Sequence, residues 1–282
     1  VIFLITVVAL TTILFSTSIV NSAATNASNR QLPIYRVDRK DNLASISFDA
    51  AWGNEDTQQI IDILAKYDVK ATFFVVGEWV DKYPESVLAL HNAGHEIMNH
   101  SDTHPHMTQL SADDMIKQVE GCSSKIEKVT GVKPNLFRPP YGDYNDSVIS
   151  TLKNAGYYTI QWDVDSLDWK ELSAEQITKR VLDKTQPGSI VLFHNAALHT
   201  PEALPMILES LKAKDIQLVK ISELIYYDNY NIDHTGQQYI ITSPESEDAT
   251  GTFSGENADS SDTADTESAV TMDIRRQLAL LE

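Results

Sequence analysis

The stretch ASISFDA at residues 44–50 joins a short apolar run to an acidic residue, Asp49, and the rest of the chain repeats this pattern. Six more apolar runs follow before residue 230, and a longer amphipathic segment separates each run from the next. Runs rich in β-branched and aromatic residues are typical of strands that are buried on both faces of a parallel sheet. We predict strands at residues 44–48, 71–76, 96–98, 135–137, 158–162, 189–193 and 216–219.

The segments between these runs have the periodicity of amphipathic helices. In residues 57–67, for example, Ile60, Ile61 and Leu64 fall on one side of a helix. We predict helices at residues 57–67, 84–93, 112–129, 146–155, 174–182 and 202–213. Alternation of strands and helices over about seven units predicts an α/β fold with a parallel sheet that closes into a (β/α) barrel.

Composition excludes several classes of protein. The chain has 282 residues, is 42% hydrophobic and has a formal net charge of −18. The apolar fraction is enough for a core, which excludes wholesale disorder. The acidity excludes general binding to nucleic acid, because that needs a basic stripe that neutralises phosphates. The single cysteine, Cys122, excludes an intrachain disulfide framework and a cysteine-based zinc finger.

The two ends of the chain differ from the middle. Residues 1–20 are uncharged and long enough to span a bilayer, so we predict a signal peptide or a membrane anchor at residues 1–24 and a linker at 25–40. Either one would place the remainder outside the cytoplasm, and an uncleaved segment would attach it to a membrane. The predicted barrel domain covers residues 41–242. Residues 243–282 contain many acidic and small polar residues, which predicts a disordered tail.

Ionisable side chains follow five of the predicted strands. Because the active sites of (β/α) barrels lie at the carboxyl ends of the strands, this placement indicates an enzyme. The residues concerned are Asp49, His100 with His104, Arg138, Asp168 and His194.

The residue types suggest roles but leave alternatives open. Two imidazoles four residues apart, at His100 and His104, can bind one cation, although such a pair also occurs in ordinary polar loops. Asp49 is a base, a metal ligand or a helix N-cap. A buried Arg138 needs a carboxylate such as Asp168. His194 suits a general acid, although a lone histidine at a strand end is often structural.

Five motifs in order resemble those of the polysaccharide deacetylase family, the NodB-homology domain of carbohydrate esterases. The resemblance covers about residues 45–224 and implies a distorted (β/α) barrel with about seven parallel strands. The motifs are SFDA at 47–50, HSDTH at 100–104, RPPY at 138–141, DSLDW at 165–169 and LFH at 192–194.

The resemblance implies hydrolysis of N-acetyl groups on amino sugars of a cell-wall glycan, either peptidoglycan or a chitin-like oligomer. A divalent metal, often zinc, would be held by His100 and His104 and would activate a water. Asp49 would act as general base and His194 as general acid.

The resemblance also implies supporting roles around these groups. The Tyr141 N–H would bind the oxyanion, and Arg138 would orient Asp49 while being held by Asp168. Trp169 and Leu192 would form the walls of the acetyl pocket.

One position departs from the family pattern. The third metal ligand of the family is an aspartate at the position that Ala50 occupies here. The metal could therefore bind weakly, or Asp102, Glu55 or Asp56 could substitute, or metal-dependent catalysis could be lost. The sequence FDAAWG at residues 48–53 is similar to a sporulation-associated subgroup of the family. A catalytically silent glycan-binding protein and an amidohydrolase of small amides are the competing hypotheses.

Overall fold

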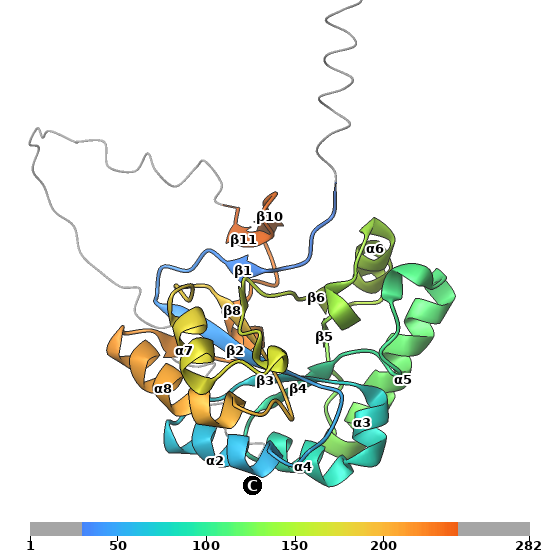
Figure 1. Cartoon of the computed structure of the whole chain (residues 1–282). Coiled ribbons are helices and arrows are strands. Elements are labelled where there is room, and N and C mark those ends of the chain that lie inside the picture. The colour runs from blue at the N-terminus through green and yellow to red at the C-terminus, as the bar shows by residue number, and fades with distance from the viewer. Residues whose placement is uncertain (1–29, 242–282) are drawn as a thin grey trace, which may run out of the picture. The chain divides into compact units, whose positions relative to one another are not determined.

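The computed structural model describes residues 30–241 (Figure 1). The expected signal peptide or anchor at 1–24 and the expected acidic tail at 243–282 lie outside this range. Within residues 30–241, no helix has both the length and the apolar composition needed to cross a membrane.

A sheet of seven parallel strands forms the centre of the fold, in the order β6-β5-β4-β3-β2-β8-β7. Helices surround it on the outside (Figure 1), so the predicted distorted (β/α) barrel is confirmed. The strands are β2 (Leu43–Ala50), β3 (Thr72–Val75), β4 (Glu96–Asn99), β5 (Leu136–Phe137), β6 (Tyr158–Thr159), β7 (Val164–Asp165) and β8 (Ile190–His194).

The helices lie where the amphipathic segments predict them, with two additions, α3 and α9. Some of them begin at a side-chain cap: the Ser111 hydroxyl, for example, accepts a hydrogen bond from the Asp114 N–H at the start of α5. The longer helices are α2 (Thr57–Lys66), α3 (Gly77–Lys82), α4 (Pro84–Asn92), α5 (Ala112–Thr130), α6 (Asp146–Asn154), α7 (Ala174–Leu182) and α8 (Thr200–Ala213). The short ones are α9 (Ile221–Leu224) and the 3₁₀ turns η1 (Met107–Gln109), η2 (Pro140–Gly142) and η3 (Asp168–Lys170).

Strand β2 lies inside the sheet between β3 and β8, and its two faces have different environments. On one face, the Phe48 ring stacks on Phe73 and on Phe193, with ring centroids 4.8 and 5.5 Å apart. On the other face, Ser47 and Asp49 point to the inside of the barrel, where the buried side chain of Arg138 contacts both. Alternation along one strand therefore separates an apolar core from a polar interior.

Three short segments differ from the prediction. Strand β7 was missed because two residues are too few to show periodicity. The run at 216–219 forms β9 (Gln217–Leu218), which pairs only with the start of β2. The third is β1 (Arg36–Val37), which lies within the segment predicted as a linker.

That part of the expected linker is folded onto the domain. Strand β1 pairs with β11 (Gln237–Ile240), which pairs in turn with β10 (Tyr230–Ile232). Ile34 and Val37 are buried. Gly188, with φ of +83°, lies against this segment, and a Cβ there would come within 1.7 Å of the Val37 carbonyl oxygen. This close approach requires glycine.

Candidate active site

The register of the sheet places Asp49 beside His194. The two residues are directly paired across β2 and β8, at the carboxyl ends of both strands. Neighbouring residues of parallel strands point to the same face, so both side chains face the interior of the barrel. Asp49 is 5% exposed. The sequence prediction that these two strand ends meet is consistent with this arrangement.

Arg138 holds the Asp49 carboxylate. Its guanidinium is fully buried, and its Nη1 donates to Asp49 Oδ1 over 2.7 Å. Its Nη2 donates to the Ser47 hydroxyl over 2.9 Å and to the Gln161 carbonyl over 3.2 Å. Burial raises the pKa of the Asp49 carboxyl, but the charge of Arg138, with smaller contributions from His100 and His194, holds that pKa below its ordinary value. Asp49 is therefore an anion at neutral pH.

The backbone of the loop after β4 brings His100 and His104 together. Ser101 and His104 both have left-handed φ values, of +68° and +59°. The Ser101 N–H donates to Asn99 Oδ1 over 2.8 Å, and the Ser101 hydroxyl accepts from the His104 N–H over 3.0 Å. The two imidazole centroids are 4.9 Å apart as a result. These contacts fix a tight turn that places the His100 and His104 side chains next to each other.

The two imidazoles are held in forms that leave a nitrogen lone pair available. His100 Nδ1 lies 2.7 Å from the Arg138 carbonyl oxygen, which can only accept, so Nδ1 carries the proton and Nε2 does not. That Nε2 lies 3.5 Å from Asp49 Oδ2. Burial, with a smaller effect of His100, lowers the pKa of His104 to about 4. Neutral imidazoles of this kind are suitable metal ligands.

The donor set nevertheless does not match a catalytic zinc site with three protein ligands. Ala50 supplies no donor and packs in the apolar core, 1% exposed. The Asp102 carboxylate lies 2.7 Å from Lys125 Nζ, and Asp56 Oδ2 accepts from the Ala196 N–H over 2.9 Å. Across residues 30–241, no three His, Cys, Asp or Glu side chains are grouped so that they could hold one ion. The substitution of another carboxylate for the missing ligand is therefore not found in this range.

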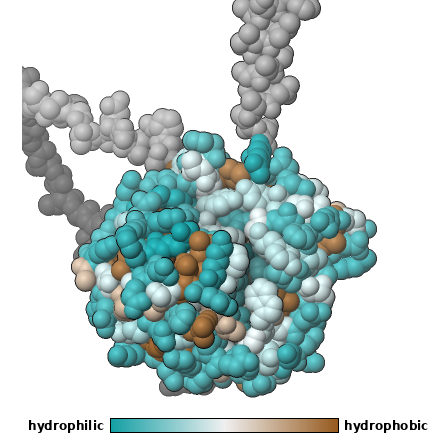
Figure 2. All heavy atoms as spheres, in the orientation of Figure 1, coloured by the Kyte–Doolittle hydropathy of each residue, from teal (hydrophilic) through white to brown (hydrophobic). Residues whose placement is uncertain are grey.

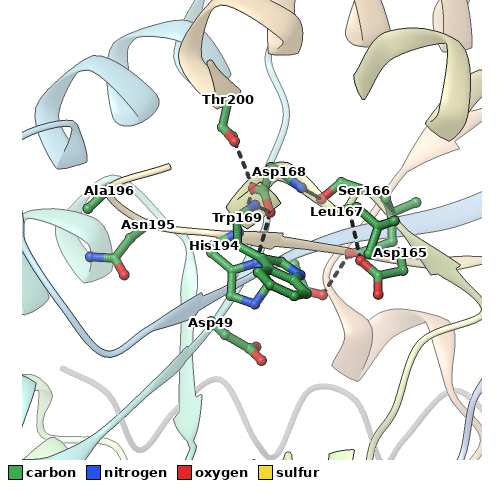
Figure 3. A network of polar contacts seen from close by, with 12 residues as sticks. Asp49, Asp165, Ser166, Leu167, Asp168, Trp169, His194, Asn195, Ala196 and Thr200 are labelled. Atoms are coloured by element: carbon green, nitrogen blue, oxygen red, sulfur yellow. Dashed lines mark hydrogen bonds and ion pairs between the residues drawn. The ribbon is translucent and has the colours of Figure 1, made fainter. Parts of the chain in front are cut away.

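Asp168 holds His194, which corrects the prediction that it holds Arg138. Asp168 Oδ1 lies 2.8 Å from His194 Nδ1, and Oδ2 accepts from the His194 N–H over 2.8 Å and from the Thr200 hydroxyl over 2.7 Å (Figure 3). Arg138 instead donates through Nη1 and Nη2 to Asp49, Ser47 and the Gln161 carbonyl, while its Nε has no hydrogen-bond partner within residues 30–241. The sequence alone does not show whether the Asp168 carboxylate pairs with Arg138 or with His194.

The charge of Asp168 changes the acidity of His194. Burial lowers the pKa of the imidazole, but the hydrogen bond and the charge of Asp168 outweigh this, and the pKa is raised above its ordinary value. Because Nδ1 is bonded to Asp168, Nε2 is the nitrogen left for a substrate. His194 therefore has the bonding arrangement of a general acid.

The expected wall residues differ in exposure. Leu192 is 2% exposed, on the same face of β8 as His194. Trp169 directly follows Asp168 in η3 and is 57% exposed. Tyr141 is 62% exposed and has a left-handed φ of +61°. Its ring centroid is 4.5 Å from that of His104, so the structure brings Tyr141 to the histidine pair.

Several supporting residues were not predicted from sequence. Ser47 and the backbone of Gln161 bind Arg138, Thr200 binds Asp168, and the His106 ring stacks on Tyr141 with centroids 4.3 Å apart. The position of Ser47 could have been predicted, because it is two residues from Asp49 on one strand and therefore faces the same side of the sheet. The others contact the site only through the tertiary fold.

Comparison with known proteins finds polysaccharide deacetylases among the relatives. A family model described as polysaccharide deacetylase matches residues 36–160. The peptidoglycan-N-acetylmuramic acid deacetylase PdaC of Bacillus subtilis is 37% identical over 188 residues, which are 67% of this chain and 40% of that protein. The peptidoglycan-N-acetylglucosamine deacetylase of Bacillus cereus is 33% identical over 184 residues, 64% of this chain and 67% of that protein. The chain thus spans less than half the length of PdaC.

Solved structures share the fold. Wild-type BA3943 from Bacillus anthracis, described as a CE4 family pseudoenzyme, is 38% identical with a TM-score of 0.66, and the match covers 68% of each chain. A mutant of BA3943 described as having restored enzymatic activity has a TM-score of 0.65 at the same identity, covering 68% of this chain and 70% of the mutant chain. The matched structures therefore include a protein described as a pseudoenzyme.

Proposed function

The chain belongs to the polysaccharide deacetylase family, and we propose that it removes N-acetyl groups from amino sugars of a cell-wall polysaccharide outside the cytoplasm. The substrate in this proposal is peptidoglycan or a chitin-like oligomer. The observation that carries it is the pairing of two differently tuned groups on adjacent strands, an anionic Asp49 and a His194 of raised pKa. The face drawn in Figure 2 is mainly hydrophilic, with apolar residues in small separate patches.

Asp49 would be the general base. Its carboxylate is ionised and oriented by Arg138, and it would take one proton from the water that attacks the acetyl carbon. Proton transfer by a positioned side chain typically accelerates a reaction by ~10²–10⁴. The price of burying Arg138 is offset only while Asp49 stays charged, so the pair also keeps the base ionised.

His194 would be the general acid. The bond between the acetyl carbon and the sugar nitrogen breaks, and the leaving amine takes a proton from Nε2 of His194. Asp168 would stabilise the charged imidazole before transfer and hold the ring in place afterwards. The hydroxide that remains after Asp49 takes a proton adds to the acetyl carbon and leaves within acetic acid, which releases its proton to water as acetate. Asp49 then gives its proton to the solvent and His194 takes one up, so atoms and charge balance over the cycle.

We assign the substrate contacts to the remaining rim residues. The Tyr141 backbone N–H would bind the oxyanion of the tetrahedral intermediate, and Trp169 and Leu192 would enclose the acetyl methyl group. The divalent metal that the family resemblance implies, zinc or another, would have only His100 and His104 as protein ligands, so we propose that the chain binds it weakly.

Release of acetate tests the proposal. Incubation of the whole chain with peptidoglycan and with an N-acetylglucosamine oligomer should release acetate in proportion to time. His194→Ala should lower the rate by about 10² or more, because the leaving amine is no longer protonated. The matched control is Val132→Ala, at an exposed site just beyond α5. Equal rates for wild type and His194→Ala would contradict the assigned acid.

A second candidate is a glycan-binding protein without catalysis. Ala50, with no replacement donor in residues 30–241, favours it, and so does the match to BA3943. This candidate predicts binding of the oligomer with no acetate release at any metal concentration. A binding titration with the oligomer, beside the acetate-release assay, therefore distinguishes the candidates.

A further inference from the structure

Trp52 is an exposed aromatic residue at the rim of the site with no role in the proposed reaction. It lies two residues beyond the end of β2, and 60% of its surface is exposed to water. Tryptophan has a large apolar surface, and such a side chain is usually buried for the most part. An indole exposed beside an active site therefore invites a search for what it contacts in the complex.

The backbone on both sides of Trp52 is fixed. The Ala51 N–H donates to Asn195 Oδ1 over 3.2 Å, and the Gly53 carbonyl accepts from Trp79 Nε1 over 3.0 Å and from Asn195 Nδ2. Asn195 and Trp79 are themselves buried, 5% and 2% exposed. The indole therefore projects from a loop that is anchored to α3 and to the end of β8. A side chain presented in this way loses little entropy when it binds a ligand.

The indole also contacts the histidine pair. Its ring meets His104 edge to face, with centroids 5.9 Å apart and planes at 64°. The His104 ring also contacts the ring of Tyr141, which is likewise exposed. Two exposed aromatic side chains, Trp52 and Tyr141, thus flank His104. Trp52 therefore lies beside His104, on the exposed rim of the site.

We propose that Trp52 binds the pyranose ring next to the one that reacts, and so makes the site prefer oligomeric glycans to single sugars. This inference rests on the proposed function. A pyranose has an apolar face of C–H groups and a rim of hydroxyls, and indole offers a flat apolar face with one N–H donor. Tryptophan is also among the residues that contribute most to binding energy in protein interfaces.

The test is a calorimetric titration with two probes, a tetramer of N-acetylglucosamine and the monosaccharide. Trp52→Ala should bind the tetramer about tenfold more weakly, equivalent to ~1.4 kcal/mol, with little change for the monosaccharide. Trp52→Phe keeps a flat apolar ring and should recover most of the loss. Val132→Ala, which removes an exposed apolar side chain elsewhere, should match the wild type. A thermal melt of each variant shows that it is folded.

Three outcomes separate the claims. If Trp52→Ala binds the tetramer as tightly as the wild type, the inference is wrong and the proposed function is unaffected. If the wild type does not bind the tetramer, both are wrong. If Trp52→Ala does not fold, Trp52→Phe decides: it should bind close to wild type, and its fluorescence change on addition of tetramer should be smaller than that of the wild type, because only Trp169 of the two rim tryptophans remains. An equal fluorescence change in both proteins contradicts the contact. No fluorescence change in the wild type contradicts it.

Discussion

Replacing Asp168 with asparagine tests the polar contacts that position His194. The carboxylate accepts four hydrogen bonds: its Oδ1 from His194 Nδ1 and the Trp169 N–H, and its Oδ2 from the His194 N–H and the Thr200 hydroxyl. Asparagine has nearly the same shape but replaces one oxygen with NH₂. In either orientation of the amide, that NH₂ faces a backbone N–H, and two donors cannot bond to each other.

The size of the effect follows from these contacts. At least one backbone donor is left without an acceptor, and the His194 bond loses its charge. Bonds to charged groups are worth about 1.5–3 kcal/mol each, and breaking a buried ion pair costs about 3–5 kcal/mol. We therefore expect Asp168→Asn to lower the free energy of unfolding by about 3–5 kcal/mol. At about 2–4 °C per kcal/mol for a domain of this size, the melting temperature should fall by roughly 10 °C.

The loss should depend on pH in a defined direction. The His194 pKa is raised in the folded state, so the stability that Asp168 gives it is fully present below the unfolded histidine pKa of about 6.5. It is lost as the pH rises through the folded value. Urea unfolding of both proteins should therefore show a larger difference at pH 6 than at pH 9.

The control and the contradicting result are specific. Thr200→Val removes one hydrogen bond from a neutral donor to Asp168 and should lower the free energy of unfolding by only about 1 kcal/mol. That loss should be the same at pH 6 and at pH 9. If Asp168→Asn unfolds within 2 °C of the wild type, or if the His194 pKa measured by NMR is unchanged, Asp168 does not hold His194 in the way described.

Two other substitutions address the loop and the missing ligand. Gly77→Ala should destabilise the fold by about 1–3 kcal/mol and disturb the histidine loop, because a Cβ would lie 2.0 Å from Asp102 Oδ1. The comparison in a thermal melt is Val132→Ala, at an exposed position. Ala50→Asp should tighten binding of zinc in a titration, because a carboxylate adds a donor and a negative charge; equal dissociation constants for both proteins would refute a site with only two histidine ligands.

The strand ends could be predicted from sequence because each motif lies next to a recognisable apolar run. Asp49 and His194 end two of the longest strands, and parallel pairing alone brings such ends to one edge. What could not be predicted was the choice of partners. Arg138 and His194 both need a carboxylate. Only the register of β2 with β8 and the position of the turn η3 show that Arg138 pairs with Asp49 and that His194 pairs with Asp168.

Short elements were the other failure. Strands β1 and β7 contain two residues each, too few for a period of two to be visible. Trp52 and Asn195 illustrate the same limit at the site. Neither belongs to a periodic segment, and the hydrogen bonds from Asn195 to the loop around Trp52 join residues more than 140 positions apart.

Acetate release by the whole chain, measured from full chelation to saturating zinc, tests the central claim most directly. Peptidoglycan is the substrate, and Asp49→Asn is the paired variant, because an amide keeps the shape of the carboxylate but cannot take a proton. We predict that the wild type releases acetate at a rate that rises with zinc and that Asp49→Asn releases none while its melting curve stays cooperative. Glycan binding without acetate release by the wild type at every zinc concentration would contradict the account and identify a silent glycan-binding protein.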